Sequence, residues 1–214
     1  MVKQATKNEI QEIKKLLLEH YAGAITELEY TNVYELLVAV MLSAQCTDKR
    51  VNIITPKLFE IYPTPAKLAR ANLADLKSII NSCSFFNNKA KNLITMAQKV
   101  MSDFDGEIPL NQDDLMSLDG VGQKSANVVL IEYTGANLMA VDTHVFRVSH
   151  RLGLSRDKTA IATELTLSKK LKSDLHTLHQ AMVLFGRYTC KAKNPQCGEC
   201  FLASYCKSRE VFKA

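Results

Sequence analysis

The sequence LDGVGQKSANVVL, residues 118–130, places a tight glycine turn between two short stretches of helical pattern. Gly120 and Gly122 let the backbone turn sharply and leave the amides around Val121 unobstructed. The helix that follows points its first N–H groups and the positive end of its dipole at the turn. The pattern predicts an anion-binding turn suited to a phosphate, although a plain helix–turn–helix corner uses glycine in the same way. Lys124 and the small residues after it favour the binding turn, because they let another surface come close.

Helical patterns extend outward from this turn over nearly the whole chain. Capping signals predict helix starts at Thr6 and Asn32, each followed three residues later by a glutamate, and Pro65 after a threonine marks another start. Residues 36–42 are apolar almost all round, which predicts a central helix. Further helices are expected over residues 48–61, 73–83, 88–104, 111–118, 124–133, 142–152, 159–172 and 173–185, the last ending at Gly186. With only 137–141 ambiguous, the sequence predicts an all-α fold of about ten helices in two packed lobes.

Four cysteines near the C-terminus are the other informative feature. Cys190, Cys197, Cys200 and Cys206 are separated by six, two and five residues. Four thiolates in one short segment match a cubane iron–sulfur cluster. Zinc also takes four thiolates, but zinc ribbons usually pair two short Cys-x2-4-Cys knuckles across a longer gap. The spacing favours iron–sulfur and leaves zinc open as the alternative.

Composition limits the class of protein without deciding its function. With 214 residues and 47% hydrophobic side chains, the chain can bury a core without disulfides. A net charge of +5 favours a nucleic-acid partner only weakly. The N-terminus lacks the apolar run of a signal peptide, and the longest uncharged apolar run, residues 36–47, is too short to span a bilayer. Cys46 and Cys83 are expected to be buried free thiols, so a soluble cytoplasmic protein without membrane contact is predicted.

Taken together, the motifs resemble the endonuclease III family of DNA glycosylases. Residues 118–130 resemble the helix–hairpin–helix of that family, and VDTHVFRV at 141–148 resembles its VDTH segment. LSAQ at 42–45 matches an earlier signature, and GRYTC at 186–190 opens the six-two-five cysteine loop. The motifs occur in the family's order and cover essentially the whole chain, so the resemblance is highly specific.

The resemblance implies a two-lobed helix–hairpin–helix DNA glycosylase fold. Its expected domains are residues 26–136, a central helical barrel with the hairpin, and residues 1–25 plus 137–214, which carry a 4Fe–4S cluster loop at 190–206. The implied activity is base excision DNA repair: an N-glycosylase removes oxidised pyrimidines such as thymine glycol from duplex DNA, and an AP lyase cuts the strand at the abasic site. The implied partner is damaged double-stranded DNA, bound by a monomer that associates with the nucleoid.

The resemblance also implies catalytic roles for two residues. Lys124, directly after the hairpin, matches the nucleophile that attacks C1′ and forms a Schiff base. The attack needs a neutral amine, and a helix N-terminus disfavours the ammonium, as partial burial also would. Asp142 matches the aspartate that stabilises oxocarbenium-like charge on the sugar, and it is also placed to cap the helix that follows. His144 is expected to support this site rather than to act as its base.

Further residues are expected to contact DNA. The target base must leave the stack before a pocket can hold it, and family members fill the gap with side chains from two loops. Gln45 matches one of them; Phe85 stands where the family usually has leucine and could act as a wedge or simply pack in the core. The turn Gly120–Val121–Gly122 is expected to hold a phosphate. Asp119 and Gln123 depart from the family's usual proline and arginine, without removing a catalytic group.

The cysteine loop is expected to be structural and to carry Lys191 and Lys193 for phosphate contacts. Three other functions compete with the proposed activity. Adenine and mismatch glycosylases of the same fold lack the lysine after the hairpin, so Lys124 argues against them. A DNA-binding module without catalysis is disfavoured because Lys124 and Asp142 are both present. Alkylbase excision stays open as a side activity.

Overall fold

The structure, a computed structural model, describes residues 3–212. Over that range it contains helices and connecting turns but no β-strand, which confirms the all-α prediction. Two compact units make up the chain: Glu27–Thr134, and a second unit that combines Met1–Thr26 with Gly135–Ala214. Within residues 3–212, no helix is both long enough and apolar enough to cross a membrane.

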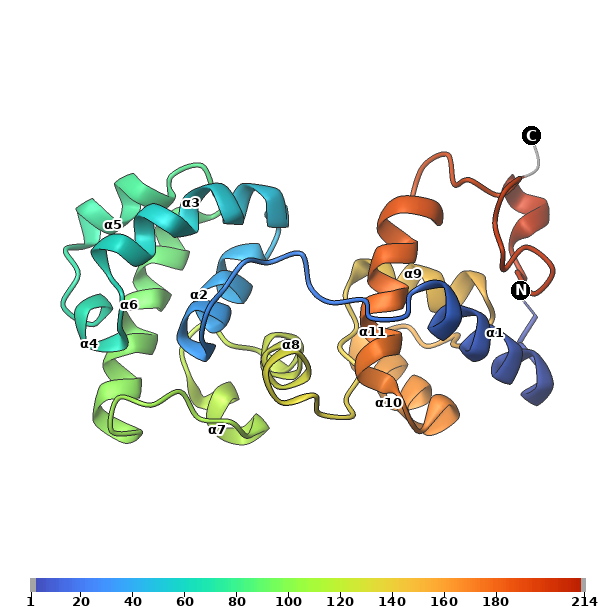
Figure 1. The fold of residues 1–214 in the computed structure, drawn as a ribbon, viewed down its shortest axis with the longest axis horizontal. Coiled ribbons are helices and arrows are strands. Elements are labelled where there is room, and N and C mark those ends of the chain that lie inside the picture. The colour runs from blue at the N-terminus through green and yellow to red at the C-terminus, as the bar shows by residue number, and fades with distance from the viewer. Residues whose placement is uncertain (1–2, 213–214) are drawn as a thin grey trace. The chain divides into compact units, whose positions relative to one another are not determined.

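The unit Glu27–Thr134 is built around α2 (Val33–Ser43), drawn in light blue in Figure 1. Every side chain from Leu36 to Leu42 is buried, as the apolar run predicted. Helices α3, α6 and α8 pack against α2, so their apolar faces share its surroundings. The other helices of this unit are α3 (Asp48–Ile61), α4 (Pro65–Leu68), α5 (Leu73–Ile80), α6 (Phe86–Asp103), α7 (Gln112–Ser117) and α8 (Gln123–Thr134).

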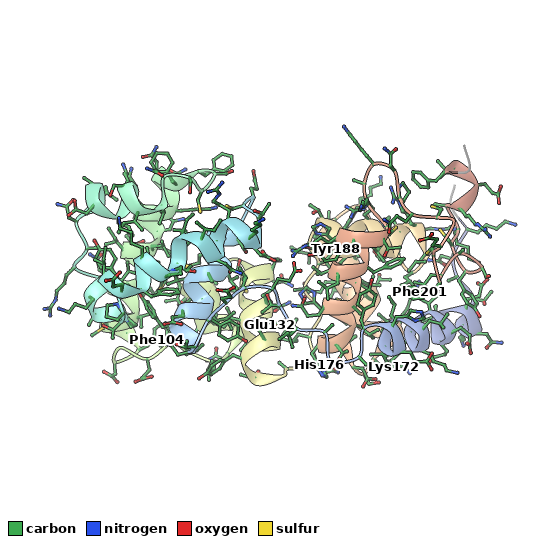
Figure 2. The ribbon with its side chains drawn as sticks, turned by 45° about the horizontal axis from the view of Figure 1, so that its top comes forward. Phe104, Glu132, Lys172, His176, Tyr188 and Phe201 are labelled. Carbon is green, nitrogen blue, oxygen red and sulfur yellow. The ribbon has the colours of Figure 1, made fainter. Side chains whose placement is uncertain are left out.

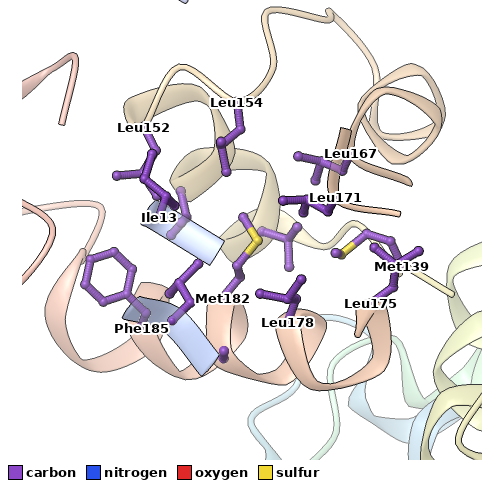
Figure 3. Close-up of a cluster of buried hydrophobic side chains, with 14 of the residues drawn as sticks. Ile13, Met139, Leu152, Leu154, Leu167, Leu171, Leu175, Leu178, Met182 and Phe185 are labelled. Carbon is purple, nitrogen blue, oxygen red and sulfur yellow. The ribbon is translucent and has the colours of Figure 1, made fainter. Parts of the chain in front are cut away.

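The second unit joins the N-terminal helix to the C-terminal third of the chain (Figure 1). Its core gathers leucine, methionine and phenylalanine side chains between α1, α9, α10 and α11 (Figure 3). Met182, near the end of α11, and Phe185, which follows that helix, are among its fully buried members. The elements of this unit are α1 (Lys7–His20), α9 (Thr143–Arg151), α10 (Ala160–Leu171), α11 (Leu175–Leu184), the π-helical turn η1 (Phe185–Thr189) and the 3-10 turn η2 (Arg209–Phe212).

The helix-start signals in the sequence are confirmed where they can be checked atom by atom. The Thr6 hydroxyl accepts from the Glu9 amide, and the Glu9 carboxylate accepts from the Thr6 amide at 2.7 Å, which completes a capping box. Thr64 caps α4 with Pro65 at the first helical turn. Asp142 caps α9. Local side-chain chemistry therefore fixes where these helices begin.

The prediction that the last long helix ends at Gly186 was wrong. Helix α11 runs into the π turn η1, which passes through Gly186 and ends at Thr189, and the Cys190 amide then donates to the Phe185 carbonyl at 2.7 Å. Gly186 serves close packing instead of termination, because a Cβ placed there would lie 2.9 Å from the His144 Cβ. The glycine thus lets the end of α11 lie directly against α9.

Candidate functional site

The turn between α7 and α8 has the geometry expected of an anion site. Gly120 has φ +79°, and a Cβ at this position would lie 2.8 Å from the Asn92 amide nitrogen on α6, so only glycine fits there without strain. The Val121 amide closes the turn on the Leu118 carbonyl at 3.1 Å. Gly122 faces open space, with nothing within 4 Å of a Cβ built on it. An anion can therefore approach the start of α8 closely.

Lys124 lies in the first turn of α8, immediately after this turn, and its side chain is exposed. Burial, one of the two activating influences considered from the sequence, is therefore not seen for the residue as a whole. The other influence, the positive end of the α8 dipole, acts within the first turn and disfavours an ammonium there. Lys124 belongs to the unit Glu27–Thr134, whereas Asp142 belongs to the second unit.

Asp142 is held by three donors at the N-terminus of α9. One carboxylate oxygen accepts from the His144 and Val145 amides, both at 2.8 Å. The other oxygen lies 2.8 Å from the His144 imidazole Nδ1. The Asp142 and His144 side chains remain 21% and 28% exposed, so the carboxylate is oriented without being sealed off. His144 thus contacts Asp142 through both its backbone amide and its imidazole.

Gln45 and Phe85 lie on two different connections of the unit Glu27–Thr134. Gln45 follows α2 and Phe85 immediately precedes α6, and both side chains are exposed, Phe85 by 64%. Core packing, the alternative considered for Phe85, is therefore wrong. Both residues have left-handed backbone, with φ 55° and 58°, a conformation that costs a non-glycine residue about 1–2 kcal/mol. We refer to Gln45 and Phe85 as the probe pair.

Two sets of contacts that the sequence did not reveal connect the segments that carry the probe pair. The Lys89 ammonium donates to the carbonyls of Leu42 and Ala44, at the end of α2. The thiols of Cys46 and Cys83 lie 3.6 Å apart. Cys83 is buried as expected, but Cys46 is partly exposed. Nothing in the local sequence pattern signals these contacts, because the partners are 37 to 47 residues apart along the chain.

The four C-terminal cysteines surround one small cavity of the second unit. All four thiols line it, and none of them is fully exposed or fully buried. Burial and the neighbouring thiols raise the pKa of Cys200 and Cys206, while the Leu202 and Ser208 amides act in the opposite direction at the two sulfurs. Among residues 3–212, no group of three or more His, Cys, Asp or Glu side chains is gathered around a point as ligands of a single ion. Sulfurs spread around a shared cavity, with amide donors nearby, fit a multi-atom iron–sulfur cluster.

Two arginines one turn apart on α9 anchor the cluster loop, residues 190–206. Arg147 donates to the carbonyls of Cys190 at 3.0 Å and Gly186 at 2.8 Å. Arg151 donates to the Lys191 carbonyl at 2.7 Å and lies 3.4 Å from the Cys190 sulfur. The helix that begins at Asp142 therefore also holds the first cluster ligand in place.

The far side of the cluster loop packs onto α1. Phe201, labelled in Figure 2, stacks on the His20 ring with centroids 3.8 Å apart and an interplanar angle of 7°. It also meets Phe185 edge-on at 5.3 Å. Lys191 and Lys193 lie on the exposed part of the loop between its first two cysteines. The loop is thus fixed at its base and presents two cations to solvent.

Comparison with known proteins agrees with this fold and with the cysteine loop. The family model of HhH-GPD superfamily base excision DNA repair proteins matches residues 38–173. The model of the iron–sulfur binding domain of endonuclease III matches residues 190–206. The first match defines the class, helix–hairpin–helix base excision DNA repair proteins. The second confirms the 4Fe–4S cofactor over zinc, with Cys190, Cys197, Cys200 and Cys206 as the thiols available to hold it.

The chain belongs to the endonuclease III family. Endonuclease III of Bacillus subtilis strain 168 is 45% identical over 189 residues, which cover 87% of this chain and 86% of the relative. The Escherichia coli K12 protein is 38% identical over 200 residues, covering 93% and 95%. A solved structure of a trapped endonuclease III–DNA covalent intermediate superposes with a TM-score of 0.93 at 41% identity, covering 96% of this chain and 98% of that one. A thermostable thymine-DNA glycosylase, at 19% identity and a TM-score of 0.85, shares the fold.

Proposed function

We propose that this chain excises oxidised pyrimidines from duplex DNA as an N-glycosylase and then cuts the strand at the abasic site as an AP lyase. The observation that carries the proposal is the position of Lys124 in the first turn of α8, directly after the open glycine turn. A phosphate bound at that turn brings the DNA backbone beside the amine. The relative trapped as a covalent DNA intermediate supports the same chemistry, because a covalent bond to DNA requires a nucleophile.

In the proposed reaction, the neutral amine of Lys124 attacks C1′ of the damaged nucleotide. The new N–C1′ bond forms as the bond from C1′ to the base breaks, and the base leaves with that electron pair and takes up a proton. The amine then passes a proton to the ring oxygen as the sugar opens to a protonated Schiff base. Loss of a proton from C2′ expels the 3′ oxygen with its phosphate, which cuts the strand.

Asp142 supplies negative charge for the first step. Positive charge develops on the sugar as the base departs, and a fixed carboxylate stabilises it. The His144 and Val145 amides hold one oxygen of Asp142, so the carboxylate has a defined direction before DNA arrives.

The 4Fe–4S cluster would supply a rigid cross-link between four sulfurs and no electron to this reaction. The cluster loop is therefore proposed to act by holding its own residues in place.

The remaining predicted residues are proposed to bind DNA. The Gly120–Gly122 turn takes a phosphate, and the probe pair fills the space that the extruded nucleotide leaves. Lys191 and Lys193 add phosphate contacts that carry no sequence preference. We further propose that the two units are the family's two domains, that the enzyme acts as a monomer, and that it works on the chromosome, which in a bacterium lies in the cytoplasm.

Borohydride trapping tests the proposed nucleophile, since it reduces a Schiff base to a stable secondary amine. We expect the wild-type protein to be trapped on duplex DNA containing an abasic site or thymine glycol, and Lys124→Gln to abolish trapping. Lys7→Gln is the matched control, because Lys7 is also an exposed lysine in the first turn of a helix. Undiminished trapping of Lys124→Gln would contradict the assignment. Base release without trapping by the wild-type protein would instead indicate a monofunctional glycosylase.

A further inference from the structure

Lys89 is a buried cation that the reaction itself does not use. The residue is 9% exposed, and its ammonium donates to the carbonyls of Leu42 at 2.7 Å and Ala44 at 2.6 Å. These carbonyls belong to the last turn and the C-cap of α2, where helix carbonyls lack partners within the helix. Lys89 therefore caps α2 from a different helix, and it does so at the peptide that leads into Gln45.

The same residue is also tied to the other half of the probe pair. The Lys89 amide donates to the Phe85 carbonyl at 3.1 Å and closes the first turn of α6 on that residue. Lys89 thus contacts the Phe85 segment through its backbone and the Gln45 segment through its side chain. The 3.6 Å contact between the Cys46 and Cys83 thiols joins the same two segments a second time.

Backbone strain at the probe pair shows that these positions are held by their surroundings. Gln45 and Phe85 both have positive φ, although neither is a glycine. Such conformations persist only where neighbouring contacts over-determine them. For Gln45, the Lys89 ammonium fixes the carbonyl of the preceding residue, Ala44, and so fixes the plane of the peptide that Gln45 shares with it.

Stability alone does not account for a lysine at this position. Burial lowers the pKa of Lys89, so the folded chain carries a desolvation penalty, which the two carbonyls and the nearby Cys46 and Cys83 thiols offset. Well-packed apolar side chains in place of buried charges are often neutral or stabilising. What the ammonium provides and an apolar chain lacks is direction, because its two bonds specify where the end of α2 lies relative to α6.

We propose that Lys89 is a positioning residue that couples the two segments, so that Gln45 and Phe85 enter the vacated space in the DNA duplex as one unit. The inference rests on the proposed gap-filling role of the probe pair. It adds that the separation of the two side chains is set inside the protein before DNA binds, by a residue that touches neither the substrate nor the reacting atoms.

The test compares DNA that has a gap to fill with DNA that has none. Lys89→Met keeps an unbranched side chain that is one atom shorter, and it removes the donors. We expect single-turnover excision of thymine glycol from duplex DNA to fall about 10- to 100-fold, the size of effect that misplacement of a supporting group produces. Cleavage of a single-stranded oligonucleotide with an abasic site, which has no stack to fill, should stay within about twofold, because the fold and the nucleophile are unchanged. Lys91→Met, on the exposed face of the same helix, should leave both rates at the wild-type level.

A double-mutant cycle separates positioning from a purely structural role. If Lys89 acts through Gln45, then adding Lys89→Met to Gln45→Ala should reduce duplex excision no further than Gln45→Ala alone. Additive losses, equal losses on both substrates, or an unchanged duplex rate would each overturn the inference. If the methionine variant does not fold, Lys89→Gln takes its place. Because glutamine keeps amide donors, we expect a smaller loss of duplex excision in the same direction. If Gln45→Ala and Phe85→Ala leave duplex excision unchanged, the proposed role of the probe pair fails instead.

Discussion

Substitution can separate the observed role of Asp142 from its proposed one, because the carboxylate caps α9 and is proposed to stabilise charge on the sugar. Asp142→Asn keeps an oxygen that can accept from the His144 and Val145 amides, and it removes the charge. The lost attraction between the charge and the helix dipole is worth about 0.3–1 kcal/mol. At about 2–4 °C per kcal/mol for a chain of this size, Tm should fall by no more than about 4 °C. Loss of a charge aimed at the transition state should lower the excision rate about 10²- to 10³-fold.

Asp142→Ala removes the charge and the cap together. Losing an aspartate N-cap costs about 0.5–2 kcal/mol, so Tm should fall by about 1–8 °C, with excision at least as slow as in the asparagine variant. Thr159→Ala is the matched control, because Thr159 caps α10 of the same unit by accepting from the Ala162 amide at 3.2 Å. It should lower Tm by a similar amount while excision stays near the wild-type rate.

The assay measures single-turnover release of thymine glycol and thermal unfolding on the same protein samples. The reasoning predicts that rate and stability separate: Asp142→Asn is slow but nearly as stable as the wild type, and Thr159→Ala is less stable but fast. If the excision rate of all three variants simply followed their Tm, Asp142 would be a helix cap and nothing more.

Three further outcomes follow from the structure. Lys191→Ala with Lys193→Ala should weaken duplex binding and reduce the slope of log K against log salt by about 1.8, with the cluster absorbance unchanged; an unaltered slope would remove both lysines from the interface. Gly120→Ala should destabilise the protein by about 1–2 kcal/mol or more because of its positive φ and close neighbour, whereas Gly122→Ala should unfold like the wild type and yet bind DNA less tightly; the opposite order would contradict the turn geometry. The pKa of Glu9 is lowered from 4.5 to about 2 by the Lys207 ammonium and by the Thr6 amide. The stability that ionised Glu9 gives the fold is therefore complete above pH 4.5 and is lost as the pH falls toward 2. Glu9→Gln should flatten that part of a plot of Tm against pH, and parallel curves for the two proteins would refute the assignment.

Local signals in the sequence predicted more of the fold than of the site. The capping box at Thr6 and the apolar run of α2 involve residues within a few positions of one another, so pattern alone was sufficient. The helix end predicted at Gly186 was wrong because a glycine after a helix usually ends it, whereas this glycine allows close packing against α9. The local sequence could not predict this contact, because α9 precedes Gly186 by more than thirty residues.

The candidate site shows the same division. The cysteine spacing and the turn at Gly120 are short-range patterns. In the structure the four cysteines line one cavity, and Gly120 has the positive φ of a tight turn. The contacts of Lys89 are not visible in the sequence, because an isolated lysine near a helix start is usually solvated, and the carbonyls it binds lie on another helix. The thiol contact of Cys46 was missed for the same reason: apolar neighbours suggest burial but do not identify a partner.

Under the proposed role of Gln45 and Phe85, their left-handed backbone has a consequence for how the protein searches DNA. If both side chains are already raised in the free protein, their strain belongs to the folding free energy and does not recur at every base pair visited. Forming two such conformations afresh, at about 1–2 kcal/mol each, would reduce the productive fraction of encounters about 5- to 30-fold per residue. An enzyme that examines many undamaged base pairs for each lesion searches faster when both side chains are already in place. The cost of their backbone conformation then lowers the stability of the fold instead of the rate of the search.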